Sequence, residues 1–247
     1  MIQLRPQGRT KTITAEAGVT GHAEGLLLVD KPAGITSHDV VQLVRRIYGE
    51  RSIGHLGTLD PFATGLLILL IGRCTRLANF IDTEPKVYEA TIRFGSETDT
   101  DDCTGSVTRE TELPAQSAVD SAIEQLTGDI MQVPPDYSAK SVDGMRAYDA
   151  ARNGAALELS AVPVHVDKWV IRERRDDSLD VTITCGTGTY IRALARDLGR
   201  MTGSYAHLTA LRRIRAGSFD VRDAVTIEEL KVKAPPLRTL HVIASNA

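Results

Sequence analysis

The sequence predicts an α+β protein with a central mixed, mainly antiparallel sheet flanked by helices. Apolar residues alternate with period 2 in some segments and recur with a period near 3.6 in others, so strands and helices are interleaved. These segments do not form β-α-β units of even length, which favours antiparallel or mixed pairing over a parallel sheet. With 247 residues, 42% of them hydrophobic, the chain can bury a core without disulfides or a structural metal.

Six segments have the pattern of strands. Residues 25–30 form a short apolar run that ends in a Lys-Pro-Ala-Gly turn, and residues 86–94 alternate apolar and polar side chains. The other predicted strands are residues 66–71, 162–172, 179–185 and 205–219. Three glycines and a proline make residues 54–65 a structured loop rather than a regular element.

Five segments have helical spacing. The first is marked by four apolar residues between positions 40 and 47, and we expect Ser37 to cap it and Gly49 to end it. The others are residues 117–126, 142–153, 189–201 and 227–232. Residues 1–24 are polar and are expected to form an N-terminal arm or a leading strand.

Charge is distributed unevenly, although the net charge is only -3. Residues 192–215 contain six basic residues and one acid, whereas residues 97–102 contain four acids and no base. The basic residues are Arg192, Arg196, Arg200, Arg212, Arg213 and Arg215, and the acids are Glu97, Asp99, Asp101 and Asp102. Two interpretations remain open: solvated faces of opposite sign, or a basic strip that faces RNA beside an acidic site.

The cysteines and the apolar runs indicate the cellular compartment in which the protein is expected. Three cysteines without a C-x-x-C pair argue against a disulfide framework and favour a reducing cytoplasm. The chain lacks the apolar centre of a signal peptide and the roughly 20 apolar residues of a membrane span. No zinc spacing is present, and the acidic segment departs from an EF-hand at Cys103, so no metal is expected.

The loop at residues 54–65 (GHLGTLDPFATG) is the densest candidate for chemistry. Its glycines permit close approach of a partner, and Pro61 restricts the backbone directly after Asp60. A carboxylate held in this way can act as a nucleophile or a base. From the residues alone, Asp60 could equally begin a turn, and His55 could be structural or could replace a flipped base in a nucleic-acid stack.

This loop resembles the G-H-x-G-x-L-D-P-x-A-x-G signature of the TruB-type tRNA pseudouridine synthases. Four further segments resemble motifs of that family in the family's order. They are residues 30–37 (DKPAGITS), 86–90 (KVYEA), 134–148 in a thumb-like insertion, and 188–199 (GTYIRALARDLG). The resemblance extends from about residue 25 to residue 230, and it implies the pseudouridine synthase fold and a tRNA pseudouridine-55 synthase that needs no cofactor.

The resemblance implies three catalytic residues. Asp60 would be the catalytic aspartate, which attacks either the ribose C1′ or the uracil C6, and both routes stay open. Tyr88 would stack on the flipped uracil and could assist proton removal. Arg192 would pair with Asp60 or with a phosphate, because a guanidinium suits both partners.

Five further residues are expected to bind substrate by the same resemblance. His55 would fill the space that the flipped base leaves in the T loop, while Lys31 and Lys140 would contact phosphates. Asp102 and Tyr190 would lie near the target nucleotide. The partner is therefore the T arm of tRNA, with no membrane and no obligate protein partner, and a monomer is expected.

The domain organisation follows the same resemblance. Residues 25–232 would form the catalytic domain, with the thumb-like insertion at about residues 134–160. Many bacterial members carry a C-terminal RNA-binding domain of the PUA type, and residues 233–247 are too few for a full one.

Two alternatives remain. The chain could help tRNA to fold without catalysis, or alongside it. It could also be a glycoside-cleaving enzyme with Asp60 and Asp102 as its carboxylate pair, which would require the two groups to lie about 5–10 Å apart.

Overall fold

The computed structural model describes residues 12–14, 23–137, 141–142, 145–146, 159–238 and 241–243. The chain divides into two compact units. The first combines residues 1–87 with residues 212–247, and the second consists of residues 88–211. The boundaries therefore fall inside two strands, β5 (Lys86–Phe94) and β13 (Ala206–Ala216).

The first unit contains a mixed sheet in the order β15-β2-β4-β13. β2 and β4 are antiparallel, whereas β15 is parallel to β2 and β13 is parallel to β4. Every residue of β4 after Thr64 is buried, which explains why this strand is a continuous apolar run rather than an alternating one. The remaining elements of the sheet are β2 (Gly25–Lys31), β3 (Ile53–Leu56), β4 (Thr64–Ile71), β14 (Phe219–Asp220) and β15 (Val225–Thr226).

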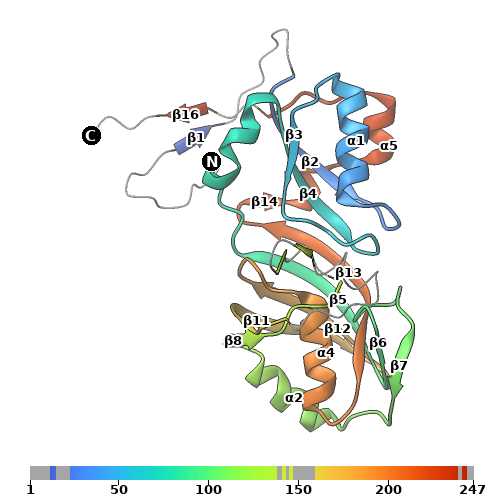
Figure 1. The fold of residues 1–247 in the computed structure, drawn as a ribbon. Coiled ribbons are helices and arrows are strands. Elements are labelled where there is room, and N and C mark those ends of the chain that lie inside the picture. Colours follow the sequence, from blue (N-terminus) through green and yellow to red (C-terminus); the bar gives the residue numbers. More distant parts are fainter. Residues whose placement is uncertain are drawn as a thin grey trace. The chain divides into compact units, whose positions relative to one another are not determined.

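Helices α1 (Ser37–Tyr48) and α5 (Ile227–Val232) lie side by side in this unit (Figure 1). The predicted cap of α1 is wrong by one residue. The cap is Thr36, whose hydroxyl accepts a hydrogen bond from the Asp39 amide at 3.0 Å in a capping box, and Ser37 is the first helical residue. Gly49 ends the helix with φ of 63°, as predicted.

Smaller elements complete the first unit. Two 3-10 helices, η1 (Gly72–Phe80) and η2 (Val221–Asp223), were not predicted. The short strands β1 (Thr12–Thr14) and β16 (His241–Ile243) pair antiparallel.

The second unit contains strands in the order β13-β5-β12-β11-β8 and a separate β6-β7 hairpin. Helices α2 (Gln116–Gln125) and α4 (Ile191–Met201) pack against each other within it (Figure 1). The α+β prediction with a mixed sheet and flanking helices is confirmed. The remaining strands are β6 (Ser96–Thr98), β7 (Val107–Glu110), β8 (Gly128–Gln132), β11 (Val162–Arg174) and β12 (Ser178–Cys185).

Two sequence predictions need correction. The helix expected at residues 142–153 is wrong at its start, because β9 (Ser141–Val142) and β10 (Met145–Arg146) form an antiparallel pair. The rest of that segment, and most of the expected thumb-like insertion, lies outside the described residues. The loop expected at residues 54–65 is shorter, since β3 and β4 occupy both of its ends. No helix in the described ranges is long and apolar enough to cross a membrane.

Candidate active site

The irregular segment that carries Asp60, residues 57–63, is called the Asp60 loop here; it joins β3 to β4 in the first unit. The Asp60 carbonyl accepts a hydrogen bond from the Ala63 amide at 3.1 Å, which closes a tight turn. The Pro61 carbonyl accepts another from the Gly34 amide at 2.8 Å. Asp60 is half-buried, while the neighbouring Leu59 is only 4% exposed and anchors the loop in the core.

A buried hydroxyl fixes the residue before Asp60. Ser37 Oγ donates to the Leu59 carbonyl at 3.0 Å and accepts from the Leu59 amide at 2.9 Å. Ser37 is 2% exposed, so water does not compete for these bonds. The sequence predicted Ser37 as a helix cap and as part of the DKPAGITS motif, but not its contact with Leu59, because a contact across 22 residues leaves no local pattern.

Lys31 lies beneath the same loop and is 0% exposed. Its Nζ donates to the carbonyls of Ile35 at 2.7 Å, Pro32 at 2.9 Å and Pro61 at 3.3 Å. Burial lowers the pKa of Lys31 to about 8, although the negative charges of Asp60 and Asp39 raise it. These three bonds tie the loop to the turn after β2, and the phosphate contact of Lys31 stays a prediction.

Arg213 holds the two ends of the loop and is 1% exposed. Its Nε donates to the Leu66 carbonyl at 2.8 Å and its Nη2 to the Gly57 carbonyl at 3.0 Å. Gly65 has φ of 99°, and a Cβ there would lie 2.2 Å from the Arg213 carbonyl oxygen, so only glycine fits. Sequence reasoning missed Arg213 as a loop support; its only signal was membership of the basic stretch.

His55 lies on β3, next to the loop, and is partly buried. Burial lowers the pKa of His55, and the positive charge of Arg213 lowers it further, so both effects favour the neutral ring. Its Nδ1 is buried and has no hydrogen-bond partner among the described residues.

In the second unit, Arg192 lies in the first turn of α4, and its side chain is 5% exposed. Nη1 donates to the Thr100 carbonyl at 2.8 Å and Nη2 to the Tyr137 carbonyl at 2.8 Å. Nη1 also lies 3.7 Å from Asp102 Oδ2. The structure thus brings Arg192 and Asp102 together, while Asp60 belongs to the other unit and its pairing with Arg192 stays a prediction.

The segment at residues 97–104, called the acidic turn here, faces α4. Asp102 is 3% exposed, and its Oδ1 accepts from the Thr100 hydroxyl and the Thr104 amide, each at 2.9 Å. Asp101 adopts φ of 59°, and its Oδ2 lies 3.0 Å from Arg196 Nη1. Burial raises the pKa of Asp101 to about 6, against the opposing effect of Arg196 and Arg192.

The basic stretch is divided between the interior and the surface. Arg192, Arg196 and Arg213 are at most 7% exposed, whereas Arg200 and Arg215 are exposed. Farther along α4, Arg200 binds Glu97 at 2.7 Å. Three arginines of α4 thus each lie beside an acid of the acidic turn, which charge counting could not reveal.

The other predicted site residues belong to the second unit. Tyr190 caps α4, and its backbone amide and carbonyl bind the buried side chain of Gln132 at 2.8 and 3.1 Å. Tyr88 lies on β5 and is 8% exposed. Lys140 lies outside the described residues.

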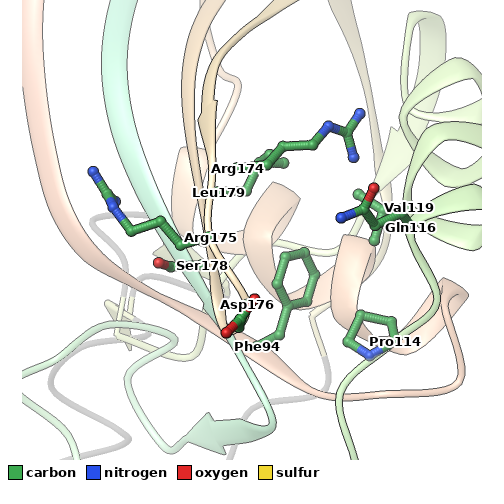
Figure 2. Close-up of a pocket in the computed structure, with 9 residues that line it drawn as sticks. All are labelled: Phe94, Pro114, Gln116, Val119, Arg174, Arg175, Asp176, Ser178 and Leu179. Atoms are coloured by element: carbon green, nitrogen blue, oxygen red, sulfur yellow. The ribbon is translucent and has the colours of Figure 1, made fainter.

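Hollows lined by described residues of the second unit include two of different size. The first has a volume of about 40 Å³, enough for a few water molecules. Figure 2 shows the side chains that line it, with the consecutive side chains of Arg174 and Arg175 pointing in different directions. The second, of about 410 Å³, is lined in part by Asp101, Arg196 and Tyr137 of the network around α4. No group of His, Cys, Asp or Glu in the described part of the chain could hold a metal ion.

Comparison with known proteins identifies the family. Residues 45–191 match the N-terminal domain of the TruB family pseudouridylate synthases, and residues 192–235 match the tRNA pseudouridylate synthase B C-terminal domain. The chain belongs to the TruB family of pseudouridylate synthases. Such enzymes are isomerases, which assigns the chain to that class.

Relatives in this family are similar over most of their length. The tRNA pseudouridine synthase B of Thermobifida fusca is 46% identical over 90% of this chain and 80% of its own. The enzyme of the same name from Mycobacterium bovis is 47% identical over 83% of this chain and 71% of its own.

Solved structures support the fold. A Cbf5-Nop10-Gar1 complex matches with a TM-score of 0.64 and 22% identity, covering 90% of this chain and 63% of that chain. An H/ACA RNP bound to a substrate RNA containing 2′-deoxyuridine matches with a TM-score of 0.61 and 20% identity, covering 90% and 62%. The chain thus spans less than two thirds of these proteins, and the similarity confirms the pseudouridine synthase fold.

Proposed function

We propose that this protein converts uridine 55 in the T loop of tRNA to pseudouridine, with the Asp60 carboxylate as the catalytic group. One observation carries the proposal: Asp60 occupies the aspartate position of the family signature, on a loop braced by buried side chains. The relatives named tRNA pseudouridine synthase B, 46% and 47% identical, support tRNA as the substrate.

The reaction breaks the C1′–N1 bond of uridine and forms a C1′–C5 bond. N1 gains a proton and C5 loses one, so the nucleotide is isomerised without a cofactor or co-reactant. Asp60 would begin this exchange by attacking C1′ or C6, since a fixed carboxylate can serve as a nucleophile toward either carbon. The detached base must then rotate before it rejoins the ribose.

Access to the base requires flipping, which costs a few kcal/mol. Tyr88 would offset part of this cost by stacking on the uracil, and such a contact is worth about 1–3 kcal/mol. His55 would occupy the space left in the T loop. Its lowered pKa favours the uncharged ring, which stacks between bases without burying a charge.

The remaining assignments belong to the same proposal. Arg192, Asp102 and Tyr190 would orient the target nucleotide, and Lys140 would contact a phosphate. Lys31 would support the Asp60 loop from below, as its three carbonyl contacts indicate.

The test is pseudouridine mapping on an unmodified tRNA transcript incubated with the wild-type protein, with Asp60→Asn and with Asp82→Asn as a control. Asp82 lies on the connection from η1 to β5 in the same unit, outside the site. We expect conversion at uridine 55 by the wild type and Asp82→Asn, and a loss of at least about 10⁴-fold in Asp60→Asn, the scale of losing an essential catalytic group.

Failure of the folded wild type to convert any uridine would contradict the enzymatic proposal for this chain. If Asp60→Asn is inactive but still promotes tRNA folding, the two activities coexist and only isomerisation depends on the carboxylate. Release of free uracil would instead indicate glycoside cleavage.

A further inference from the structure

We propose that Ser37 is a positioning residue for the Asp60 carboxylate, an inference that rests on the proposed function of Asp60. Ser37 belongs to α1 and does not need to touch the substrate for this role. It acts through the backbone of Leu59, to which its hydroxyl is bonded in both directions.

The two peptide groups on either side of Asp60 are both held by hydrogen bonds. The Leu59 carbonyl, which accepts from Ser37 Oγ at 3.0 Å, belongs to the peptide group whose nitrogen is that of Asp60. The Asp60 carbonyl, which accepts from the Ala63 amide at 3.1 Å, belongs to the next peptide group. Both planes that flank the Asp60 Cα are thus held, which fixes the direction in which its side chain leaves the backbone.

Ser37 is itself firmly held. It is the first residue of α1, a helix held in the first unit by the buried side chains of Val40, Val41 and Val44. Its hydroxyl is enclosed, because Ser37 is 2% exposed and Leu59 is 4% exposed. A short side chain on a regular helix positions a contact more accurately than a side chain on a mobile loop.

The position of a catalytic group affects the reaction rate. Displacement of a catalytic group by about 1 Å can reduce a rate by about 10²-fold, because the reacting atoms no longer meet at the required distance and angle. The loss should appear in the chemical step, and tRNA affinity should remain unchanged, since Ser37 is too buried to contribute to the binding surface.

The chain offers a matched control in the adjacent residue. Thr36→Ala removes the cap of the same helix but none of the bonds to Leu59. Ser37→Ala removes the bonds to Leu59 and retains the cap. The two variants therefore separate a general weakening of α1, which should lower Tm by about 2–4 °C, from a specific displacement of the loop.

The experiment measures single-turnover isomerisation by full-length protein at saturating concentration over unmodified tRNA transcript, together with tRNA Kd and Tm. For Ser37→Ala we expect a rate about 10- to 100-fold below wild type with Kd unchanged. For Thr36→Ala we expect both the rate and Kd to stay within about twofold, since the helix start is weakened but Leu59 remains bonded. Should Ser37→Ala fail to fold, Ser37→Cys keeps a weak donor of similar size and should give an intermediate rate.

The inference is overturned if the Ser37 variant and Thr36→Ala reduce the isomerisation rate by the same factor. It is also overturned if the Ser37 variant weakens tRNA binding and leaves the isomerisation rate unchanged. Asp60→Asn is measured in parallel. Full activity in Asp60→Asn would overturn the proposed function itself, whereas an inactive Asp60→Asn beside an unimpaired Ser37 variant would overturn only the positioning role.

Discussion

The Asp60 loop and the acidic turn both carry carboxylates, but they hold them in different ways. Around Asp60, the bracing bonds run to backbone atoms of the loop, including those of Leu59 and Pro61. In the acidic turn, the carboxylates of Asp101 and Asp102 are themselves buried and receive the bonds. The first arrangement fixes a chain position, and the second neutralises charge inside a core.

This difference matters for the proposed role of Asp60. A catalytic side chain must leave the backbone in a fixed direction, and bonds to the backbone on either side of it supply that. A carboxylate that compensates a buried arginine needs the opposite, because an unpaired charge in the interior is costly. Three predictions test the contrast, in addition to the variants proposed above.

The largest effect is expected from Arg192→Ala. The change removes the arginine that lies 3.7 Å from Asp102 Oδ2, together with its hydrogen bonds to the carbonyls of Thr100 and Tyr137. Breaking a buried pair by removing one partner typically costs about 3–5 kcal/mol of unfolding free energy, which urea denaturation measures.

A matched control for this variant is Arg93→Ala in the same unit. The Arg93 side chain is 57% exposed and pairs with Asp177 at 3.3 Å, so removing it should cost at most about 1 kcal/mol. Equal losses in the two variants would contradict a special role for the buried network.

A smaller effect is expected from Asp101→Asn, and it should depend on pH. The folded pKa of about 6 lies above the ordinary value of 3.8. Between these values the folded chain binds a proton that the unfolded chain does not, so this carboxyl's contribution to stability falls as pH rises from 4 to 6. Relative to Asp101→Asn, the wild type should lose about 1–3 kcal/mol across that window.

Denaturation of both proteins at several pH values between 4 and 7 checks this expectation. A wild-type advantage that grows with pH would mean that Arg196 dominates over burial. The Asn variant is suitable because its amide oxygen can still accept from Arg196 while the titration is removed.

The last effect is about fivefold in rate and is expected from the titration of Lys31. The pKa of Lys31 in the folded protein is about 8, below the ordinary value of 10.5. Between these two pH values only the unfolded chain carries the charge, so the contribution of Lys31 to stability rises with pH in that window. The rate should move the other way. A neutral amine has only two N–H groups for the three carbonyls, and its hydrogen bonds are weaker than those of an ammonium group. The isomerisation rate should therefore fall roughly fivefold above pH 8.

Single-turnover rates of wild type and Lys31→Met from pH 6.5 to 9.5 test this prediction. The wild-type profile should bend near pH 8, and the bend should be missing in the variant. A bend that persists in Lys31→Met belongs to another group.

Much of the local structure was predictable from the sequence. The four apolar positions of α1 at helical spacing and Gly49 predicted that helix, and the alternation in residues 86–94 predicted β5. Where prediction failed, local signals were weak or misleading. β8 has only five residues, and the helical spacing from residue 142 gave way to the pairing of β9 with β10.

Some residues of the candidate site were predictable from the sequence and others were not. Asp60, His55 and Arg192 stand out by motif, so the sequence alone was enough to predict the family and the candidate reactive residues. Ser37 and Arg213 could not be predicted as supports of the Asp60 loop. Their partners lie 22 and 156 residues away at Leu59 and Gly57, and no local pattern encodes such a contact.

The sequence by itself determined the α+β class, most element positions and the TruB family, because periodicity and motif spacing are properties of neighbouring residues. Only the tertiary structure decided which charges are buried. The sequence did not reveal that Arg192, Arg196 and Lys31 each lie in the interior. Burial and hydrogen-bond partners depend on which distant segments pack together, and the energy of a charge depends on that environment far more than on its neighbours in the chain.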